Sequence, residues 1–362
     1  MNARTASARE NLKYDHGAMT LKCEYHDNLS AANVHADASL GRTGQPQLFN
    51  RLSWMEGLEA MCLDGAPTSF AHAQKEGAHS WLFLKKERFF QHSALANWYN
   101  FTAGPIFFGA KHEVTKLSLL SAMAKKLTRK SHRITLSPMP DENDLAHLTE
   151  RAFRHSGWFV VREQCDENHI LHVNGRTFDD YWKGRPGQLR STVRRKSKKN
   201  DVAIRIETQF TEECWEDYLT VYRRSWKPEE GNADFLKALA QQEAAAGCLR
   251  LGLAYIDGTP VAAQFWTSEN GEALIHKLAH DERAIKSSPG TLLSAALFQH
   301  VIDVDKVALI DFGTGNDRYK NDWMEEIRPR YRLDMFWPHN PMSWPYILKH
   351  WISGLVAERR NG

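Results

Sequence analysis

Residues 249–279, LRLGLAYIDGTPVAAQFWTSENGEALIHKLA, decide the fold of this chain. Three apolar runs are separated here by two short polar pairs, Asp257-Gly258 and Asn270-Gly271. Such pairs favour two-residue turns whose twist matches that of paired strands, because both turn positions need a positive φ. The stretch therefore predicts three antiparallel strands joined by two tight hairpins.

The segments on both sides of this hairpin unit alternate between helix and strand patterns. A basic helical segment broken at Pro186-Gly187 (178–200), a strand (201–208) and two helices (211–226 and 233–247) precede it. A helix (287–302), a strand (306–312), a helix after Gly315 and a strand (331–337) follow it. Hairpins in the middle and a crossover after them predict a mixed sheet with helices on its faces, in the α/β class.

The first half of the chain shows a looser version of the same alternation. Helical patterns cover 48–63, 114–127 and 141–156, and strand patterns cover 80–96, 132–138, 158–163 and 169–173. We expect two related domains in tandem, at 36–173 and 174–340. A polar, aperiodic lead (1–35) is predicted to be disordered, and an amphipathic helix (341–362) is predicted to end the chain.

Composition excludes several classes of protein. The net charge of +3 is too small for a general nucleic-acid binder, although the positive charge is locally concentrated. The five cysteines are scattered without a C-x-x-C pair, which favours a reduced, cytoplasmic chain without a zinc ribbon. No apolar run approaches the roughly 18 residues of a membrane span. We therefore expect a soluble cytoplasmic protein without a metal.

Residues 308–323, ALIDFGTGNDRYKNDW, place polar side chains where a buried strand ends. A phosphate cradle, a calcium loop and an active-site floor are the three interpretations. The acids at 311, 317 and 322 do not have the alternating spacing of a calcium loop. A P-loop lysine is missing, and no kinase glycine-rich loop accompanies the Asp-Phe-Gly triplet. The stretch is best interpreted as the floor of an active site.

Three segments together resemble a known family. LRSTVRRKSKK (189–199), HKLAHDERAIKSSPGTLL (276–293) and IDFGTGNDRYKNDW (310–323) are similar to the FemAB-related acyltransferases, and within them to the CelD-like, cellulose-biosynthesis acetyltransferases. The similarity covers about 175–337, and ANWYNFTAGPIF (96–107) resembles the first half of such proteins more weakly. The resemblance implies tandem GNAT-like domains and a site in which acyl-CoA or acetyl-CoA enters between two splayed strands and an amine attacks the thioester.

The resemblance also assigns roles to residues. A helix start would cradle the pyrophosphate, because its unpaired N–H groups and dipole favour anions. Asp311 or His276 would accept the proton of the amine, and Tyr319 would protonate the leaving thiolate. The implied cradle, with a nearby cation, consists of Ser288, Pro289, Gly290, Thr291, Leu292 and Lys286. The standard GNAT loop, Q/R-x-x-G-x-G/A, is not present here.

Each of these residues also has a purely structural interpretation. The Ser-Ser-Pro-Gly segment starts a helix in the preferred way, with serine at the cap and proline in the first turn. Asp311 can serve as a turn carboxylate, His276 as a satisfied histidine of the sheet, and Tyr319 as a packing residue. The sequence leaves both interpretations open.

Two features bear on the acceptor. Six basic residues crowd positions 190–199, and WPYILKHWISGLVAERR (344–360) is aromatic, amphipathic and ends basic. Both suit an anionic membrane surface. We expect a small-molecule or lipid amine as acceptor, such as a sphingoid base or a polysaccharide precursor of the cell envelope. We also expect peripheral contact with the inner face of the membrane and no specific nucleic acid. Two alternatives stay open: a FemAB-type ligase that uses aminoacyl-tRNA, and a non-catalytic partner in envelope polysaccharide synthesis.

Overall fold

The structure of the protein is a computed structural model that describes residues 21–199 and 201–361. In the second half, Asp257, Gly258, Asn270 and Gly271 all have positive φ, between 47° and 78°, so the two hairpin turns form as predicted. The predicted mixed sheet with helices is confirmed. The elements of this half are β8 (Ala203–Glu207), α6 (Glu212–Arg223), α7 (Ala233–Ala245), β9 (Leu249–Ile256), β10 (Thr259–Glu269), β11 (Glu272–His280), α8 (Pro289–Gln299), β12 (Leu309–Thr314) and β13 (Glu326–Phe336).

The first half repeats the central part of this order. A hairpin is followed by a crossover helix and a parallel strand, so that β4 runs parallel to β6 as β11 runs parallel to β12. The elements of this half are β1 (Lys22–His26), α1 (Leu52–Met61), β2 (Thr68–Lys75), β3 (Ala78–Glu87), β4 (Gln91–Ala94), β5 (Ile106–Phe108), α2 (Glu113–Leu127), β6 (Arg133–Pro140), α3 (Leu145–His155) and β7 (Phe159–His172).

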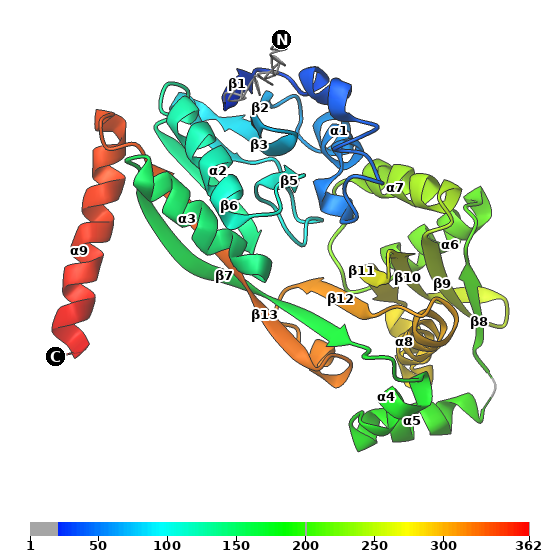
Figure 1. Ribbon diagram of the computed structural model, residues 1–362. Helices are drawn as coiled ribbons and strands as arrows, with labels where there is room; N and C mark the ends of the chain where they lie inside the picture. Colours follow the sequence, from blue (N-terminus) through cyan, green and yellow to red (C-terminus); the bar gives the residue numbers. More distant parts are fainter. Residues whose placement is uncertain (1–20, 200, 362) are drawn as a thin grey trace, which may run out of the picture.

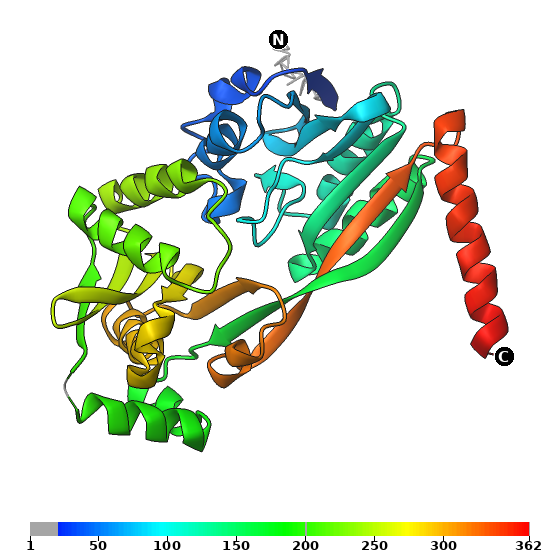
Figure 2. The ribbon, with the colours of Figure 1, turned by 180° about the vertical axis from the view of Figure 1, so that it is seen from behind.

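The two halves share one continuous sheet because they exchange a strand. The strand order is β1-β2-β3-β4-β6-β13-β7-β12-β11-β10-β9-β8, with β5 paired to β3. Strand β13 belongs to the second half by sequence, but it pairs with β6 and β7 of the first half. Strand β7 in turn pairs with β12 of the second half. Figures 1 and 2 show β7 and β13 as the long strands that connect both ends of the molecule.

Helices cover the sheet through buried apolar clusters, whose removal from water stabilises the layers. Helices α2 and α3 pack on the first half. In the second half, α8 packs on one face, together with α4 (Phe178–Lys183) and α5 (Gly187–Ser197). Helices α6 and α7 pack on the other face, in a cluster that also contains residues of α1. These two sides of the second half are called the α8 face and the α6 face below.

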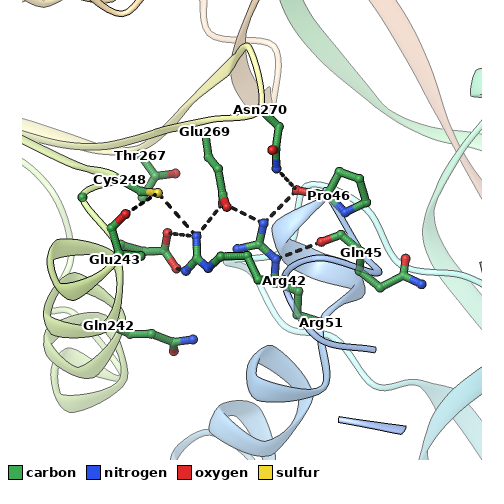
Figure 3. A network of polar contacts seen from close by, with 12 residues as sticks. Arg42, Gln45, Pro46, Arg51, Gln242, Glu243, Cys248, Thr267, Glu269 and Asn270 are labelled. Carbon is green, nitrogen blue, oxygen red and sulfur yellow. Dashed lines mark hydrogen bonds and ion pairs between the residues drawn. The ribbon is translucent and has the colours of Figure 1, made fainter. Parts of the chain in front are cut away.

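A buried ion-pair network joins the halves on the α6 face (Figure 3). Arg42 donates to Glu243 on α7 at 2.7 Å and to Glu269 on β10 at 2.6 Å. Arg51 donates to the same Glu269 at 2.7 Å. In the described part of the chain, Glu243, Cys248 and Glu269 form one group of metal-type donors, but the Arg42 guanidinium bonds to all three. The group therefore holds the halves together as an ion-pair network.

The predicted disorder of the lead is wrong where the structure can be compared with it. Residues 22–26 form β1, which pairs with β2 in register from Lys22 with Gln74 to His26 with Phe70. Residues 29–35 form a 3₁₀ helix whose Leu29 and Ala32 are buried. Tertiary pairing with the sheet edge orders a segment that carries little local signal. Residues 1–20 of the predicted lead lie outside the part of the chain that the structure describes.

Three other predictions need correction. The two short strands predicted at 158–163 and 169–173 are one strand, β7, because β13 pairs along its polar middle. The helix predicted after Gly315 is only a short 3₁₀ turn at 318–322. Ser288 precedes α8 as predicted, but it has φ 54° and its side chain makes no capping hydrogen bond.

The predicted C-terminal helix is present as α9 (Trp344–Asn361). It lies at the edge of the molecule in both views (Figures 1 and 2). Trp344, Leu348, Trp351 and Ile352 are between 53% and 67% exposed, and their spacing of four, three and one places them on one stripe of the helix. Among the described residues, no helix is long and apolar enough to cross a bilayer.

Candidate active site

Strands β11 and β12 separate after three paired positions. Glu272, Ala273 and Leu274 pair with residues 309–311, and beyond Asp311 the two parallel strands no longer pair. A pocket of about 280 Å³ lies where they diverge. Its walls come from the ends of β11 and β12, the start of α8, and the loop that contains Trp226.

A β-bulge at His276 decides which side chains of β11 reach this pocket. Ile275 pairs with Trp266 and Lys277 pairs with Phe265, so His276 is the extra residue. The bulge reverses the alternation of side chains along the strand. Leu274 therefore packs in the cluster of the α6 face, whereas Leu278, four residues later, lines the pocket on the α8 face.

The predicted cradle residues lie at the start of α8. Ser288, Pro289, Gly290 and Thr291 line the pocket, and the first-turn N–H groups of Gly290 and Thr291 have no intrahelical acceptor. The side chain of Gln264, on β10, donates to Gly290 O at 3.3 Å and to Ser294 Oγ at 2.7 Å. The first turn of α8 is thereby fixed against the sheet.

Two other predicted cradle residues lie outside the pocket lining. Leu292 is buried and borders a different cavity, between α8 and α5. Lys286 is exposed at the rim, where its carbonyl oxygen accepts a hydrogen bond from Lys196 Nζ of α5. This bond brings the basic helix to the pocket rim. Arg194, Arg195, Lys198 and Lys199 are exposed and form no ion pair within the part of the chain that the structure describes.

Tyr319, on the turn after β12, also lines this pocket. Its ring meets that of Phe312 edge to face, at 5.7 Å between centroids. Burial and the neighbouring Asp317 carboxylate raise the pKa of Tyr319, so the phenol keeps its proton at physiological pH. Lys320 holds this turn in place: its Nζ donates to Thr314 O at 2.5 Å and to Gly315 O at 3.1 Å.

Asp311 lies at the predicted place, the end of the buried strand, but its carboxylate is fully engaged. Oδ1 accepts from Asn168 Nδ2 at 2.6 Å and from Gly313 N at 2.7 Å. Oδ2 accepts from Arg328 Nη2 at 3.0 Å. These contacts support a structural role at the exchanged strands more than the predicted role as a proton acceptor.

His276 lies on the bulge between the rings of Phe101 and Phe265, at centroid distances of 5.7 and 5.1 Å. Its Nε2 is 2.9 Å from Thr267 Oγ1. Burial lowers the pKa of His276 to about 3, so the imidazole is neutral at physiological pH. The structure thus places Tyr319 and four cradle residues around one pocket, with His276 on the neighbouring bulge and Asp311 turned away.

The sequence did not single out Glu272, at the first position of β11. Burial, and next the charge of Asp311, raise the pKa of Glu272 to about 7. Glu272 lines a second pocket, of about 300 Å³, between the two halves of the chain. The only signal in the sequence was an acid directly after the Asn270-Gly271 turn, which is also an ordinary place for an exposed residue.

Comparisons with known proteins agree with this geometry. Residues 187–321 match the family model described as acetyltransferase (GNAT) domain. The comparison with curated proteins found no match.

Several solved structures share the fold of both halves at low sequence identity. FemX matches with a TM-score of 0.58 and 10% identity, covering 86% of this chain and 96% of that one. L-PGS from Bacillus licheniformis matches with a TM-score of 0.50 and 14% identity, covering 84% of this chain and 96% of that one. The C-terminal domain of a lysylphosphatidylglycerol synthetase candidate from Agrobacterium fabrum matches with a TM-score of 0.51 and 11% identity. The match covers 75% of this chain and 83% of that one. Residues 187–321 are therefore similar to GNAT-type acetyltransferase domains, and the two-half fold around them is similar to those of FemX and L-PGS.

Proposed function

We propose that this protein is an N-acyltransferase that moves an acyl group from a coenzyme A thioester to an amine. The observation that supports this most is the pocket between the diverging strands β11 and β12, with the first turn of α8 at its wall. A thioester needs such a gap in the sheet to reach an acceptor, and a pyrophosphate needs the free N–H groups of a helix start.

In this proposal each part of the pocket has one task. The N–H groups of Gly290 and Thr291 hold the pyrophosphate, and the exposed cations of Lys286 and α5 meet the outer phosphate. The amine nitrogen attacks the thioester carbonyl carbon, the C–N bond forms and the C–S bond breaks. The leaving thiolate takes a proton from the Tyr319 phenol, whose raised pKa keeps that proton available. The proton that the amine releases passes to solvent, because the pKa of His276, lowered by burial to about 3, makes its imidazole too weak a base to keep it.

The acceptor in this proposal is an amine of the cell envelope, borne by a lipid or a polysaccharide precursor. Two features support a lipid surface. The exposed apolar stripe of α9 has the aromatic and aliphatic side chains of an interfacial helix. The exposed basic residues of α5 suit anionic headgroups, which attract each nearby lysine or arginine by about 1 kcal/mol.

The proposal is tested by release of coenzyme A thiol from a panel of acyl-CoAs mixed with amines, including a sphingoid base and amino sugars. We expect thiol release that depends on both substrates and is lost in Tyr319→Phe. Coenzyme A that fails to bind the wild type in calorimetry would overturn the proposal.

A second candidate is an aminoacyl transferase that takes its donor from tRNA. Two observations favour it: the fold shared with FemX, and the fold shared with a protein whose name specifies an aminoacyl lipid as product. The basic helix α5 beside the donor pocket suits the phosphates of an acceptor stem as well as those of coenzyme A. Saturable tRNA binding together with transfer of a labelled aminoacyl group, and no binding of coenzyme A, would select this candidate. If the protein transferred neither an acyl group from coenzyme A nor an aminoacyl group from tRNA, the remaining hypothesis would be a non-catalytic partner in envelope synthesis.

A further inference from the structure

The second pocket lies on the α6 face, close behind the donor pocket. Asp311 lines the second pocket, and the next residue, Phe312, lines the donor pocket. Because consecutive side chains of a strand point to opposite faces, the two pockets lie on the two sides of β12. Strand β12 stops pairing with β11 after Asp311, and a thioester would be reached through the gap that follows.

Both halves of the chain build the second pocket. The sheet forms its floor through Glu272 and Leu274 of β11 and Asp311 of β12. The first half forms its walls through Phe49, Phe101 and the segment around Glu142. A cavity assembled from both halves at the rear of the donor gap is suited to a second substrate.

The arginines at this pocket are already neutralised. Arg328 donates to Asp311 at 3.0 Å and, through Nη1, to Glu142 at 2.8 Å. Arg330 donates to the other Glu142 oxygen at 2.9 Å, to Asn168 Oδ1 at 2.7 Å and to Phe101 O at 3.2 Å. Two guanidinium groups thus balance two carboxylates in a closed network that leaves neither arginine free for an anionic ligand.

Glu272 is outside this network. Its carboxylate makes no hydrogen bond or ion pair with any residue that the structure describes, although it is partly buried and lines the pocket. Asp311 on β12 and Glu142 add negative charge around it, and Arg328 and Arg330 on β13 add positive charge. A partly buried carboxylate that has no partner among the described residues costs free energy, which a ligand cation recovers.

We propose that the second pocket is the acceptor site and that Glu272 binds the ammonium group of the acceptor amine. This inference rests on the proposed function, since it names the place and the charge of its second substrate. Lys116 of α2, which also lines the pocket, belongs to no ion pair with described residues and lies 5.5 Å from the Phe107 ring centroid. An acceptor with an acidic group beside its amine finds a contact there as well.

The test compares amines with their N-acetylated forms in calorimetry, on the wild-type protein and on Glu272→Gln. Ethanolamine, glucosamine and an ω-amino acid are the probes, at up to millimolar concentration. At least one free amine should bind the wild type while its N-acetylated form does not. Glu272→Gln should lose about tenfold or more of that affinity, as for a buried charge pair. Glu76→Gln, the same chemical change at an exposed position outside this pocket, should keep it.

The dependence on pH gives a second readout. Amine binding to the wild type should strengthen from about pH 6 to about pH 8, as Glu272 ionises, and binding to Glu272→Gln should stay flat over that range. Equal amine affinity of wild type and Glu272→Gln, or no preference for any free amine over its N-acetylated form, would overturn the inference.

Coenzyme A binding separates this outcome from failure of the proposed function. Glu272→Gln should bind coenzyme A as the wild type does, because the donor pocket lies on the other side of β12. If coenzyme A binds and no free amine is preferred, the acceptor site is wrong and the proposed function stands. If an amine binds at Glu272 and coenzyme A does not bind, the proposed donor is wrong and the acceptor site stands.

Discussion

Asp311 and Phe312 are consecutive residues of β12, and their side chains enter two different pockets. Phe312 packs beside Tyr319 in the donor pocket, and Asp311 is fixed by Asn168 and Arg328 in the pocket behind. One strand therefore separates the place proposed for the thioester from the place proposed for the amine. Strand β11 stops pairing with β12 after Leu274, beside these two residues.

Tyr319→Phe should lower kcat without unfolding the protein. Removal of a general acid costs about 10²–10⁴ in rate, and the phenol ring, which packs on Phe312, is retained by phenylalanine. Steady-state thiol release and thermal unfolding measure the two effects. Unchanged turnover would assign Tyr319 to packing alone.

Gly290→Val should abolish coenzyme A binding while leaving the fold intact. A side chain at position 290 projects into the donor pocket at the free N–H groups, and its first carbon comes no closer than 3.5 Å to His280. Calorimetry with coenzyme A tests this. Gly187→Val, at the start of α5 where an added Cβ meets no atom within 4 Å, is the matched control. Equal binding by Gly290→Val and wild type would place the cradle elsewhere.

Arg42→Met should destabilise the whole chain. It leaves Glu243, whose side chain is 1% exposed, as a buried charge without its partner (Figure 3). Breaking a buried pair costs about 3–5 kcal/mol, to be measured by urea unfolding. The control is Arg223→Met, whose partner Glu216 and own side chain are each 61% exposed; it should cost less than about 1 kcal/mol. Similar losses for both variants would contradict the role of the network.

Charge reversal at Arg194, Arg195 and Lys198 of α5 should release the protein from liposomes that contain anionic lipid. Each of these residues contributes about 1 kcal/mol near such a surface. The same reversal at Lys125 and Lys126, exposed residues of α2, should have little effect. We expect only weak tRNA binding, with a salt slope of about −0.7 to −0.9 per phosphate contact. Tight, saturable tRNA binding at physiological salt would favour the second candidate function.

The free energy of unfolding should fall as the pH falls below about 6.5. Burial lowers the pKa of His72 and His276 to about 3 and that of His92 to about 4. The unfolded chain binds protons at these histidines at a higher pH than the folded chain, so acid favours unfolding by up to about 1.4 kcal/mol per pH unit for each. Urea unfolding at neutral and mildly acidic pH measures this slope. His72→Gln should reduce it and His155→Gln, at an exposed position, should not.

Local chemistry made much of the fold predictable. The turns at Asp257-Gly258 and Asn270-Gly271 need positive φ, and Asp, Asn and Gly are the residue types that adopt it most readily. Pro186-Gly187 separates α4 from α5 for an equally local reason. The middle of β7, with Glu163 and Asp166, carries no local strand signal, because its strand character comes from pairing with β13, more than 150 residues away.

The same distinction applies to the candidate site. The cradle and Tyr319 follow strands in a regular order, so their meeting could be predicted. The contacts of Asp311 could not: Asn168 is 143 positions away in sequence and arrives only through the exchanged strands. Glu272 escaped notice for the same reason, since its burial depends on walls formed by the first half of the chain.

The place of β13 between β6 and β7 governs how this chain can be made. While a ribosome is still translating the second half, the first half lacks an interior strand, and the edge of β6 has no partner. That edge receives its partner only when residues 326–336 emerge, after all the other strands of the second half. Until then the nascent chain exposes an open sheet edge, which is where chaperones bind and where neighbouring nascent chains pair wrongly. A fragment cut at the midpoint would inherit this open edge permanently.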